Sequence, residues 1–233
     1  MKAFFDGEGS LLFMRVGILI VTLLYLTDMF FLVPKYTKCK YDHTPRKRKL
    51  MWKGACIGVP FVLLLIGTVL KATVAFDYRD FLILTAMGIC AVGDIVIEIR
   101  FFKGGLIFFA GHVFYVSALL SFQKGVSVVS VAAYVILAVT GCTLTYIKLS
   151  KKYRAFMMGY NLIISGSFAL SLPLIYKGEP ALMFFGIGAC FLAISDWILA
   201  RNKAYKSTYG WSLLSLMFYF GGQILISAYP YLK

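Results

Sequence analysis

Acidic side chains and histidines are scarce in this sequence. Its 233 residues include ten Asp and Glu and two His, against twenty-four Lys and Arg. Charged residues of both signs make up only 15% of the chain, whereas hydrophobic residues make up 61%, and the mean hydropathy is +0.83. A soluble domain of this size needs far more polar surface, so the composition excludes one and indicates a membrane protein.

Two other classes of protein are excluded by where particular residues fall. The net charge of +14 does not indicate a nucleic-acid partner, because the basic residues lie between apolar runs and form no face interleaved with aromatics. The cysteines are too scattered to predict a disulfide framework or a zinc site; they are Cys39, Cys56, Cys90, Cys142 and Cys190.

Long apolar runs recur along the whole chain, and each could cross a hydrocarbon core of roughly 30 Å as a helix. The first run is retained as a real span, since an acidic start with Asp6 and Glu8 is atypical of a signal peptide. We therefore predict an all-α bundle forming a single transmembrane domain over 1–233, with eight spans near 11–33, 54–75, 80–101, 104–123, 126–148, 155–176, 180–200 and 209–231.

The basic residues predict the orientation of these spans. Seventeen lie in the loops after spans one, three, five and seven, whereas the other three loops hold four: Lys71, Arg79, Lys124 and Lys177. This asymmetry places the first set of loops in the cytoplasm and both termini on the other side. The run from Arg46 to Lys49 is a positive-inside anchor or, alternatively, a site for anionic headgroups. The membrane is the cell membrane in a bacterium or the endoplasmic reticulum in a eukaryote.

Four carboxylates fall inside predicted spans: Asp28, Asp94, Glu98 and Asp196. Each costs about 2.5–3.5 kcal/mol at a helix centre, so a functional or paired role is expected for it. The three aspartates each precede the predicted cytoplasmic end of a span by roughly 7–11 Å. His112 and Asn161 reach a similar depth on other spans, which predicts one polar layer and a site within it.

Structural roles compete with function at each position. Glu98 could be an interfacial residue beside Arg100, and Asp28 could pair with a lysine such as Lys53. His112 could be a satisfied interhelical hydrogen bonder. Gly93 and Ser195, just before Asp94 and Asp196, suit either a tight helix seam or a pocket.

Four segments resemble the YhhN family of integral membrane proteins, whose characterised members are lysoplasmalogenases. They are GDIVIE at 93–98, GGLIFFAGHVFYVSALLSF at 104–122, GACFLAISDWILARNKA at 188–204 and YFGGQILIS at 219–227. With Lys53 at the start of the second span, the likeness extends over most of the chain. The sequence departs from the family pattern after Lys53, where Gly54 stands in place of proline.

The resemblance implies hydrolysis of the vinyl ether bond of lysoplasmalogens, giving a fatty aldehyde and a glycerophospho-base. It implies eight helices, no metal or organic cofactor, and a lysophospholipid substrate drawn from the membrane. Asp94 and Asp196 would be the family's acidic pair. The residues that would line the substrate pocket are His112, Tyr115, Tyr219 and Gln223.

Vinyl ether hydrolysis needs a proton donor and a group that stabilises an oxocarbenium-like cation. Two nearby buried carboxyl groups can supply both by holding one proton between them, much as glycosidases use two carboxylates. We hypothesise that Asp94 and Asp196 form this pair, and the sequence does not assign the acid. Asn161 and Glu98 are further candidates for substrate binding, and basic residues at helix ends are candidates for the phosphate: Lys53, Arg100, Lys103 and Arg201.

Two other functions use the same features. A proton- or ion-coupled transporter would also place carboxylates between helices, but polar residues would then continue into the outer half of the bundle, where the sequence shows few. A structural or sensory protein is the third possibility, and it gives the buried acids no purpose. The headgroup preference and the oligomeric state are not predicted.

Overall fold

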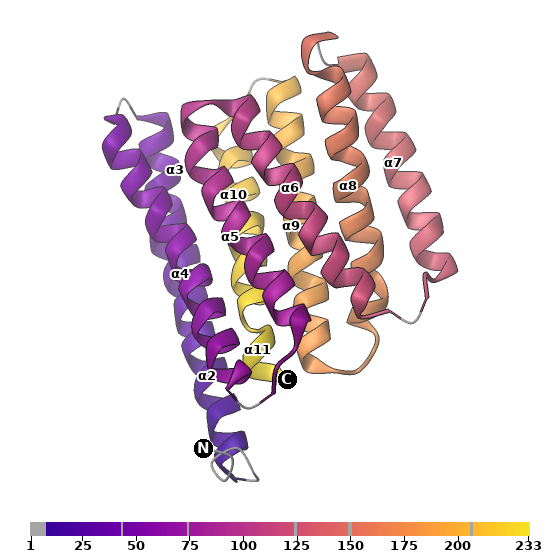
Figure 1. Ribbon diagram of the computed structural model, residues 1–233. Coiled ribbons are helices and arrows are strands. Elements are labelled where there is room, and N and C mark those ends of the chain that lie inside the picture. The colour runs from indigo at the N-terminus through magenta and orange to yellow at the C-terminus, as the bar shows by residue number, and fades with distance from the viewer. Residues whose placement is uncertain (1–7, 43, 74, 124, 149–150, 206) are drawn as a thin grey trace.

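The computed structural model describes residues 8–42, 44–73, 75–123, 125–148, 151–205 and 207–233, which are mainly helical and form no strand (Figure 1). Eight of the described helices are long and apolar enough to cross a membrane. The predicted all-α bundle of eight spans is therefore confirmed, and the chain is an integral multi-pass membrane protein. Asp6 and Lys124 lie outside the described residues.

The helices follow one another along the chain with short connections. Their bounds are α2 Glu8–Thr27, η1 Asp28–Leu32, α3 Val33–Tyr41, α4 Arg46–Ala72, α5 Tyr78–Ile99, α6 Phe101–Ser121, α7 Val128–Lys148, α8 Lys151–Ile175, α9 Pro180–Ala204, α10 Tyr209–Ser227 and α11 Tyr229–Leu232. From the third span on, the predicted limits agree with these to within about one helical turn.

The first two spans are longer than predicted. The first span is continuous through α2, the π-helical segment η1 and α3, so it ends at Tyr41 and not near residue 33. The second begins at Arg46, about two turns earlier than expected. The prediction stopped at Pro34 and the lysines beyond it. However, the wider turn of η1 comes immediately before Pro34 and accommodates a residue that has no backbone N–H to donate. Long basic side chains at a helix end can also reach polar surroundings.

α10 lies inside the bundle and organises it. It packs along α9 and also contacts α2, α3, α4 and η1, while α5 pairs with α6 on the neighbouring side. α8 lies against α9, and α7 lies against α8 at the edge of the molecule (Figure 1). On α7 only Ser130 and Ala138 are buried, so most of this helix faces lipid.

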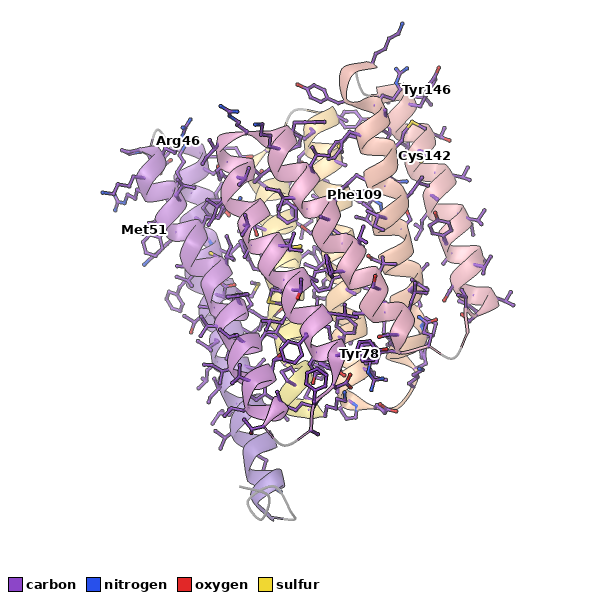
Figure 2. The ribbon with its side chains drawn as sticks, in the orientation of Figure 1. Arg46, Met51, Tyr78, Phe109, Cys142 and Tyr146 are labelled. Atoms are coloured by element: carbon purple, nitrogen blue, oxygen red, sulfur yellow. The ribbon has the colours of Figure 1, made fainter. Side chains whose placement is uncertain are left out.

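The start of α2 and the short helix α11 lie at the same end of the bundle (Figure 1). Arg46 and Tyr146 lie at the opposite end, far from Tyr78 (Figure 2). The structure therefore places the four strongly basic connections at one end, as eight antiparallel spans require. The assignment of that end to the cytoplasm remains a prediction.

α11 fills a narrow space between the first two spans. The hydroxyl of Tyr231 donates to the carbonyl of Leu63 at 2.8 Å. A Cβ atom on Gly17 would lie 2.9 Å from the Tyr231 ring, and one on Gly67 would lie 2.5 Å from Pro230. Both positions therefore need glycine, because any larger side chain would force α11 away.

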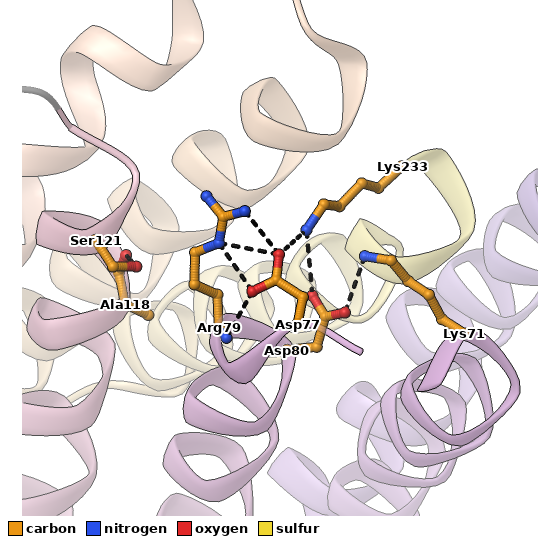
Figure 3. Close-up of polar contacts among 7 residues, drawn as sticks. All are labelled: Lys71, Asp77, Arg79, Asp80, Ala118, Ser121 and Lys233. Atoms are coloured by element: carbon orange, nitrogen blue, oxygen red, sulfur yellow. Dashed lines mark hydrogen bonds and ion pairs between the residues drawn. The ribbon is translucent and has the colours of Figure 1, made fainter. Parts of the chain in front are cut away.

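A cluster of charged side chains closes the same end of the bundle (Figure 3). Asp77 caps α5 and accepts from the backbone N–H of Arg79 at 2.9 Å, from its guanidinium at 2.7 Å and from Lys233. Asp80, 2% exposed, lies 2.9 Å from Lys71 and 3.7 Å from Lys233. Burial alone would raise the pKa of Asp77, but the hydrogen bonds from Arg79 and Lys233 outweigh it and lower that pKa below its usual range.

Candidate active site

A cavity of about 420 Å³ lies between the ends of the helices near Arg46. Its wall combines apolar side chains, including Phe108, Phe156 and Leu216, with carboxyl, ammonium and hydroxyl groups. Both Asp94 on α5 and Asp196 on α9 line it, although they lie a hundred residues apart in the chain. The volume is in the range of small-ligand sites.

Asp94 is held at both of its carboxyl oxygens. It is 4% exposed, and Nζ of Lys53 lies 3.3 Å from Oδ1. The hydroxyl of Tyr219 donates to Oδ2 at 2.5 Å, and Gln223 donates in turn to that hydroxyl at 2.5 Å. The Lys53 ammonium supplies the positive charge that a buried carboxylate needs.

Lys53 bridges two carboxylates. Its Nζ also lies 3.1 Å from Oε1 of Glu98, which accepts a hydrogen bond from Tyr36 on α3. With Glu98 and Asp94 ionised, the three charged groups carry one net negative charge at the inner part of the cavity. Glu98 is therefore part of this network and is not a separate interfacial residue.

Asp196 is held at one oxygen only. Nε2 of His112 lies 2.9 Å from Oδ2, and the hydroxyl of Tyr160 donates to the same Oδ2 at 3.0 Å. No described residue bonds to Oδ1. This carboxyl group therefore has one oxygen that is fixed by residues of α6 and α8 and one that has no partner among the described residues.

No hydrogen bond joins Asp94 to Asp196, both of which belong to the described part of the chain. Each carboxyl has its own set of partners, and the two meet only through the cavity that they share. That the two nearby carboxyl groups hold one proton between them stays a hypothesis. The arrangement gives the two groups different surroundings.

Comparison with protein-family models gives one match, the YhhN family, over residues 52–229. The match covers about three quarters of the chain. This protein belongs to the YhhN family. The family is known as lysoplasmalogenase-like, which suggests a hydrolase role. No curated protein and no solved structure matches the chain significantly.

In this YhhN protein, three of the four pocket residues implied by the family lie behind the cavity wall, and His112 is one of them because it contacts Asp196 without lining the cavity itself. Gln223 contacts Tyr219 and does not reach the cavity itself. Tyr115 is 1% exposed, with its ring centroid 6.1 Å from that of His112. Nδ1 of His112 and the Tyr115 hydroxyl are both buried without a hydrogen-bond partner among the described residues. Tyr219, Glu98 and Lys53 line the cavity directly.

Asn161 is not brought to this cavity. Its amide donates to the carbonyl of Ala138 at 3.2 Å and accepts from Nε1 of Trp197 at 3.2 Å. It lines a separate cavity of about 250 Å³ beside α7. Successive residues on a helix point about 100° apart, so Tyr160, one position earlier, contacts Asp196 in its place.

Asp28 also lies away from the cavity. It is fully buried, both of its carboxyl oxygens lack a hydrogen-bond partner, and the thiol of Cys56 lies beside it. Lys53 is not its partner, since that ammonium contacts Asp94 and Glu98. Because α3 extends to Tyr41, Asp28 lies roughly three and a half turns from the helix end, deeper than the predicted layer.

The sequence reasoning missed several cavity residues. Tyr36 and Lys40 fell in an expected loop, and Tyr160 was passed over for its polar neighbour. The available signal in the sequence of α3 was Tyr36 one turn before Lys40, at the end of an apolar run. Lys40 and Lys203 line the cavity, whereas Arg100, Lys103 and Arg201, suggested for phosphate, do not.

The described residues contain no group of three or more His, Cys, Asp or Glu side chains that could hold a metal ion. The polar groups of the site are instead paired with one another. Their chemistry is that of proton transfer and charge stabilisation.

Proposed function

We propose that this YhhN protein hydrolyses the vinyl ether bond of alkenyl lysophospholipids, releasing a fatty aldehyde and a glycerophospho-base. The observation that carries the proposal is the contrast between two carboxyl groups on one cavity. Asp94 is balanced by Lys53 at 3.3 Å, whereas the contacts of Asp196 within the described part of the chain are with His112 and Tyr160, and both reach Oδ2. Two carboxyl groups in different environments are typical of a general acid and its ionised partner.

The reaction begins with proton transfer to the double-bond carbon that is not bonded to oxygen. The carbon next to oxygen then carries the positive charge of an oxocarbenium ion. Water adds to that carbon and loses a proton, and the resulting hemiacetal separates into aldehyde and alcohol. A catalyst must therefore deliver one proton, stabilise one positive charge and take one proton back.

Asp196 has the geometry of the proton donor. His112 and Tyr160 both contact Oδ2, so the acidic hydrogen belongs on Oδ1, which has no partner among the described residues. When that proton leaves, the same two partners stabilise the carboxylate. The carboxylate can then accept a proton from the attacking water, which returns the site to its starting state.

Asp94 has the geometry of the charge stabiliser. Its two oxygens are held by Lys53 and Tyr219, so it is fixed in position before the substrate arrives. A buried and preorganised carboxylate stabilises a developing cation better than mobile water would. Lys53 also pairs with Glu98, so Asp94, Glu98 and Lys53 together carry a net negative charge when both carboxylates are ionised.

The depth of the site suits a single-chain lipid. Apolar side chains such as Phe108, Phe156 and Leu216 form part of the wall and can contact the alkenyl chain. The phosphate would remain near the polar end of the bundle while the vinyl ether reaches the aspartates. We propose the same two membranes as above, the bacterial cell membrane or the endoplasmic reticulum.

The test is aldehyde release by purified protein in neutral detergent. A vinyl-ether lysophospholipid and its saturated-ether counterpart are compared in wild type, Asp94→Asn and the matched control Glu179→Gln. We expect aldehyde from the vinyl ether only, a loss of at least about 100-fold in Asp94→Asn, and full activity in the control. Equal aldehyde in every sample, including one without protein, would refute the proposal.

One observation favours the alternative of an ion-coupled carrier. The end near Tyr78 holds the buried Asp80, paired with the partly buried Lys71 (Figure 3). A second cavity of about 540 Å³ also lies at this end. The sequence had indicated few polar groups there. The core of the bundle contains fully buried apolar side chains, and Met87 near the middle of α5 is one of them. Proton-coupled uptake into proteoliposomes, with no aldehyde release, would identify a carrier.

A further inference from the structure

Two lysines from different helices lie at the outer part of the cavity. Lys40 at the end of α3 and Lys203 at the end of α9 both line the cavity and are exposed. Nζ of Lys203 lies 4.0 Å from the ring centroid of Phe101, which is also in the wall. Neither ammonium forms a salt bridge with any residue in the described ranges. Their position contrasts with that of Lys53, whose charge is already used by two carboxylates.

Charge is therefore separated along the cavity. Glu98 is close enough to Lys40 to attract it, whereas Lys53, Lys203 and Lys49 are close enough to repel it, so ammonium groups outnumber carboxylates around Lys40. The inner end, with Asp94, Glu98 and Lys53, has an excess of negative charge. A molecule with an anion at one end and a developing cation at the other matches this polarity.

Hydroxyl groups complete the polar mouth. Tyr41 contacts Ser212 at 2.7 Å and Ser207 at 3.0 Å, and the two serines lie 2.8 Å apart. All three line the cavity, as does Asn202. Hydroxyl hydrogens can rotate toward an incoming acceptor, so this group can donate to anionic oxygens or to a glycerol hydroxyl.

We propose that Lys40 and Lys203 form a phosphate subsite that holds the phosphodiester of the lysophospholipid. The inference rests on the proposed function, since it assigns a second part of the same substrate. Lysine binds phosphate as a point charge, and two of them on different helices can hold the anionic oxygens between them. The Tyr41, Ser207 and Ser212 hydroxyls lie at the same end of the cavity as the two ammonium groups.

The subsite also determines how far the substrate enters the cavity. Lys203 and Asp196 lie on one helix, roughly 10 Å apart along its axis. In a lysophospholipid, the glycerol carbons separate the phosphate from the ether oxygen at the first position. A phosphate held at the mouth therefore brings the vinyl ether to Asp196, whereas a neutral alkenylglycerol has no such anchor.

The kinetic test separates binding of the phosphate from chemistry. Lys40→Met/Lys203→Met is compared with wild type and with Lys38→Met, an exposed lysine on α3 outside the cavity, in neutral mixed micelles. The substrates are an alkenyl lysophospholipid and the alkenylglycerol with the same chain. For the phospholipid we expect KM to rise at least tenfold in the double variant, with kcat within twofold.

The other arms have defined outcomes. Kinetics on alkenylglycerol should not change in any variant, and Lys40→Arg/Lys203→Arg should restore most of the phospholipid KM because it restores the charge. An unchanged phospholipid KM in the double methionine variant would overturn the subsite. An equal loss on both substrates would overturn it too, since the lysines would then serve the fold or the chemistry.

A binding measurement works without turnover. The Tm of the protein is recorded with a saturated-ether lysophospholipid, with the corresponding alkylglycerol and with inorganic phosphate. We expect the lysophospholipid alone to raise Tm in wild type, and the rise to be lost in the double methionine variant. A rise with inorganic phosphate would identify free phosphate as the ligand instead. If wild type releases no aldehyde from either substrate, the proposed reaction fails, and this binding result still decides the subsite.

Discussion

The two ends of the bundle both hold buried charge, but they use it differently. Near Tyr78, the carboxylates of Asp77 and Asp80 are surrounded by Arg79, Lys71 and Lys233 (Figure 3). At the cavity end, one oxygen of Asp196 has no partner among the described residues, and Lys40 and Lys203 form no salt bridge with any of them. The carboxylates of the first cluster pair with cations and line neither cavity, whereas Asp94 and Asp196 of the second both line a cavity.

The difference separates structural charge from functional charge. Removing a charged group from water costs free energy at either end, and a closed network recovers it through internal pairing. An open network leaves part of that interaction to be made with a ligand. We infer that burial of a charged group alone does not indicate a functional site in this family member. A buried charged group that lines a cavity and has an atom without a described partner does indicate one.

The largest effect is expected at Asp196. Asp196→Asn removes the proposed donor while keeping the shape of the side chain, so aldehyde release should fall by at least about 100-fold. Tm should change little, because asparagine can still accept from Tyr160. The measurement is the rate of aldehyde release per folded molecule. Comparable activity in this variant would mean that Asp196 is not the acid.

The second effect is expected at the end near Tyr78. Asp80→Asn leaves Lys71 near an uncharged group, and breaking such a buried pair costs about 3 kcal/mol. Thermal unfolding in detergent should show a Tm lower by several degrees, with aldehyde release per folded molecule unchanged. The exposed control Asp42→Asn should shift Tm little. A large loss of activity in Asp80→Asn would show that the two ends are coupled, as a carrier requires.

A smaller effect is expected at Tyr160. Tyr160→Phe removes one of the two contacts to Oδ2 of Asp196, which stabilises the carboxylate formed during proton transfer. We expect kcat to fall about tenfold, with KM nearly constant. The matched variant Tyr134→Phe, on α7, should behave as wild type. A change in KM alone would place Tyr160 in substrate binding.

The smallest effect is expected from the pH dependence at Asp77. Its lowered pKa in the folded protein means that it stabilises the fold above its ordinary pKa near 4, and this contribution is lost as pH falls toward the folded value. Wild type should exceed Asp77→Asn in Tm by a small, constant amount from pH 7 to 5. The gap should narrow below about pH 4. A gap that widens on acidification would contradict the assigned sign.

Much of the fold could be predicted because apolar length decides where a helix spans a membrane. The limits of α5 to α10 followed from that rule. Asp94 and Asp196 stood out as costly groups within apolar helices, and the structure places both on one cavity. Lys53 was named from the family resemblance, but its contacts with Asp94 and Glu98 depend on α4 beginning earlier than the apolar run.

The rest depended on rotation about helix axes and on contacts between distant segments. Asn161 was predicted at the site where its neighbour Tyr160 lies, which is an error of one residue in the side of α8 that faces the cavity. Hydrophobic periodicity does not correct such an error in helices that are apolar on all sides. The π-helical segment from Asp28 also changes the facing of every residue after it, including Tyr36 and Lys40. The cluster around Asp77 includes Lys233, and no local sequence pattern predicts that Lys233 lies beside α5.

The docking of α11 has a consequence for biosynthesis. Gly17 and Gly67 leave the ribosome long before Tyr231, yet all three meet in one tightly packed contact. The first two helices must therefore remain in the bilayer with an unfilled gap between them until α11 has been synthesised. Assembly of this bundle includes a step in which α11 docks between two helices that precede it in the chain by more than 150 residues.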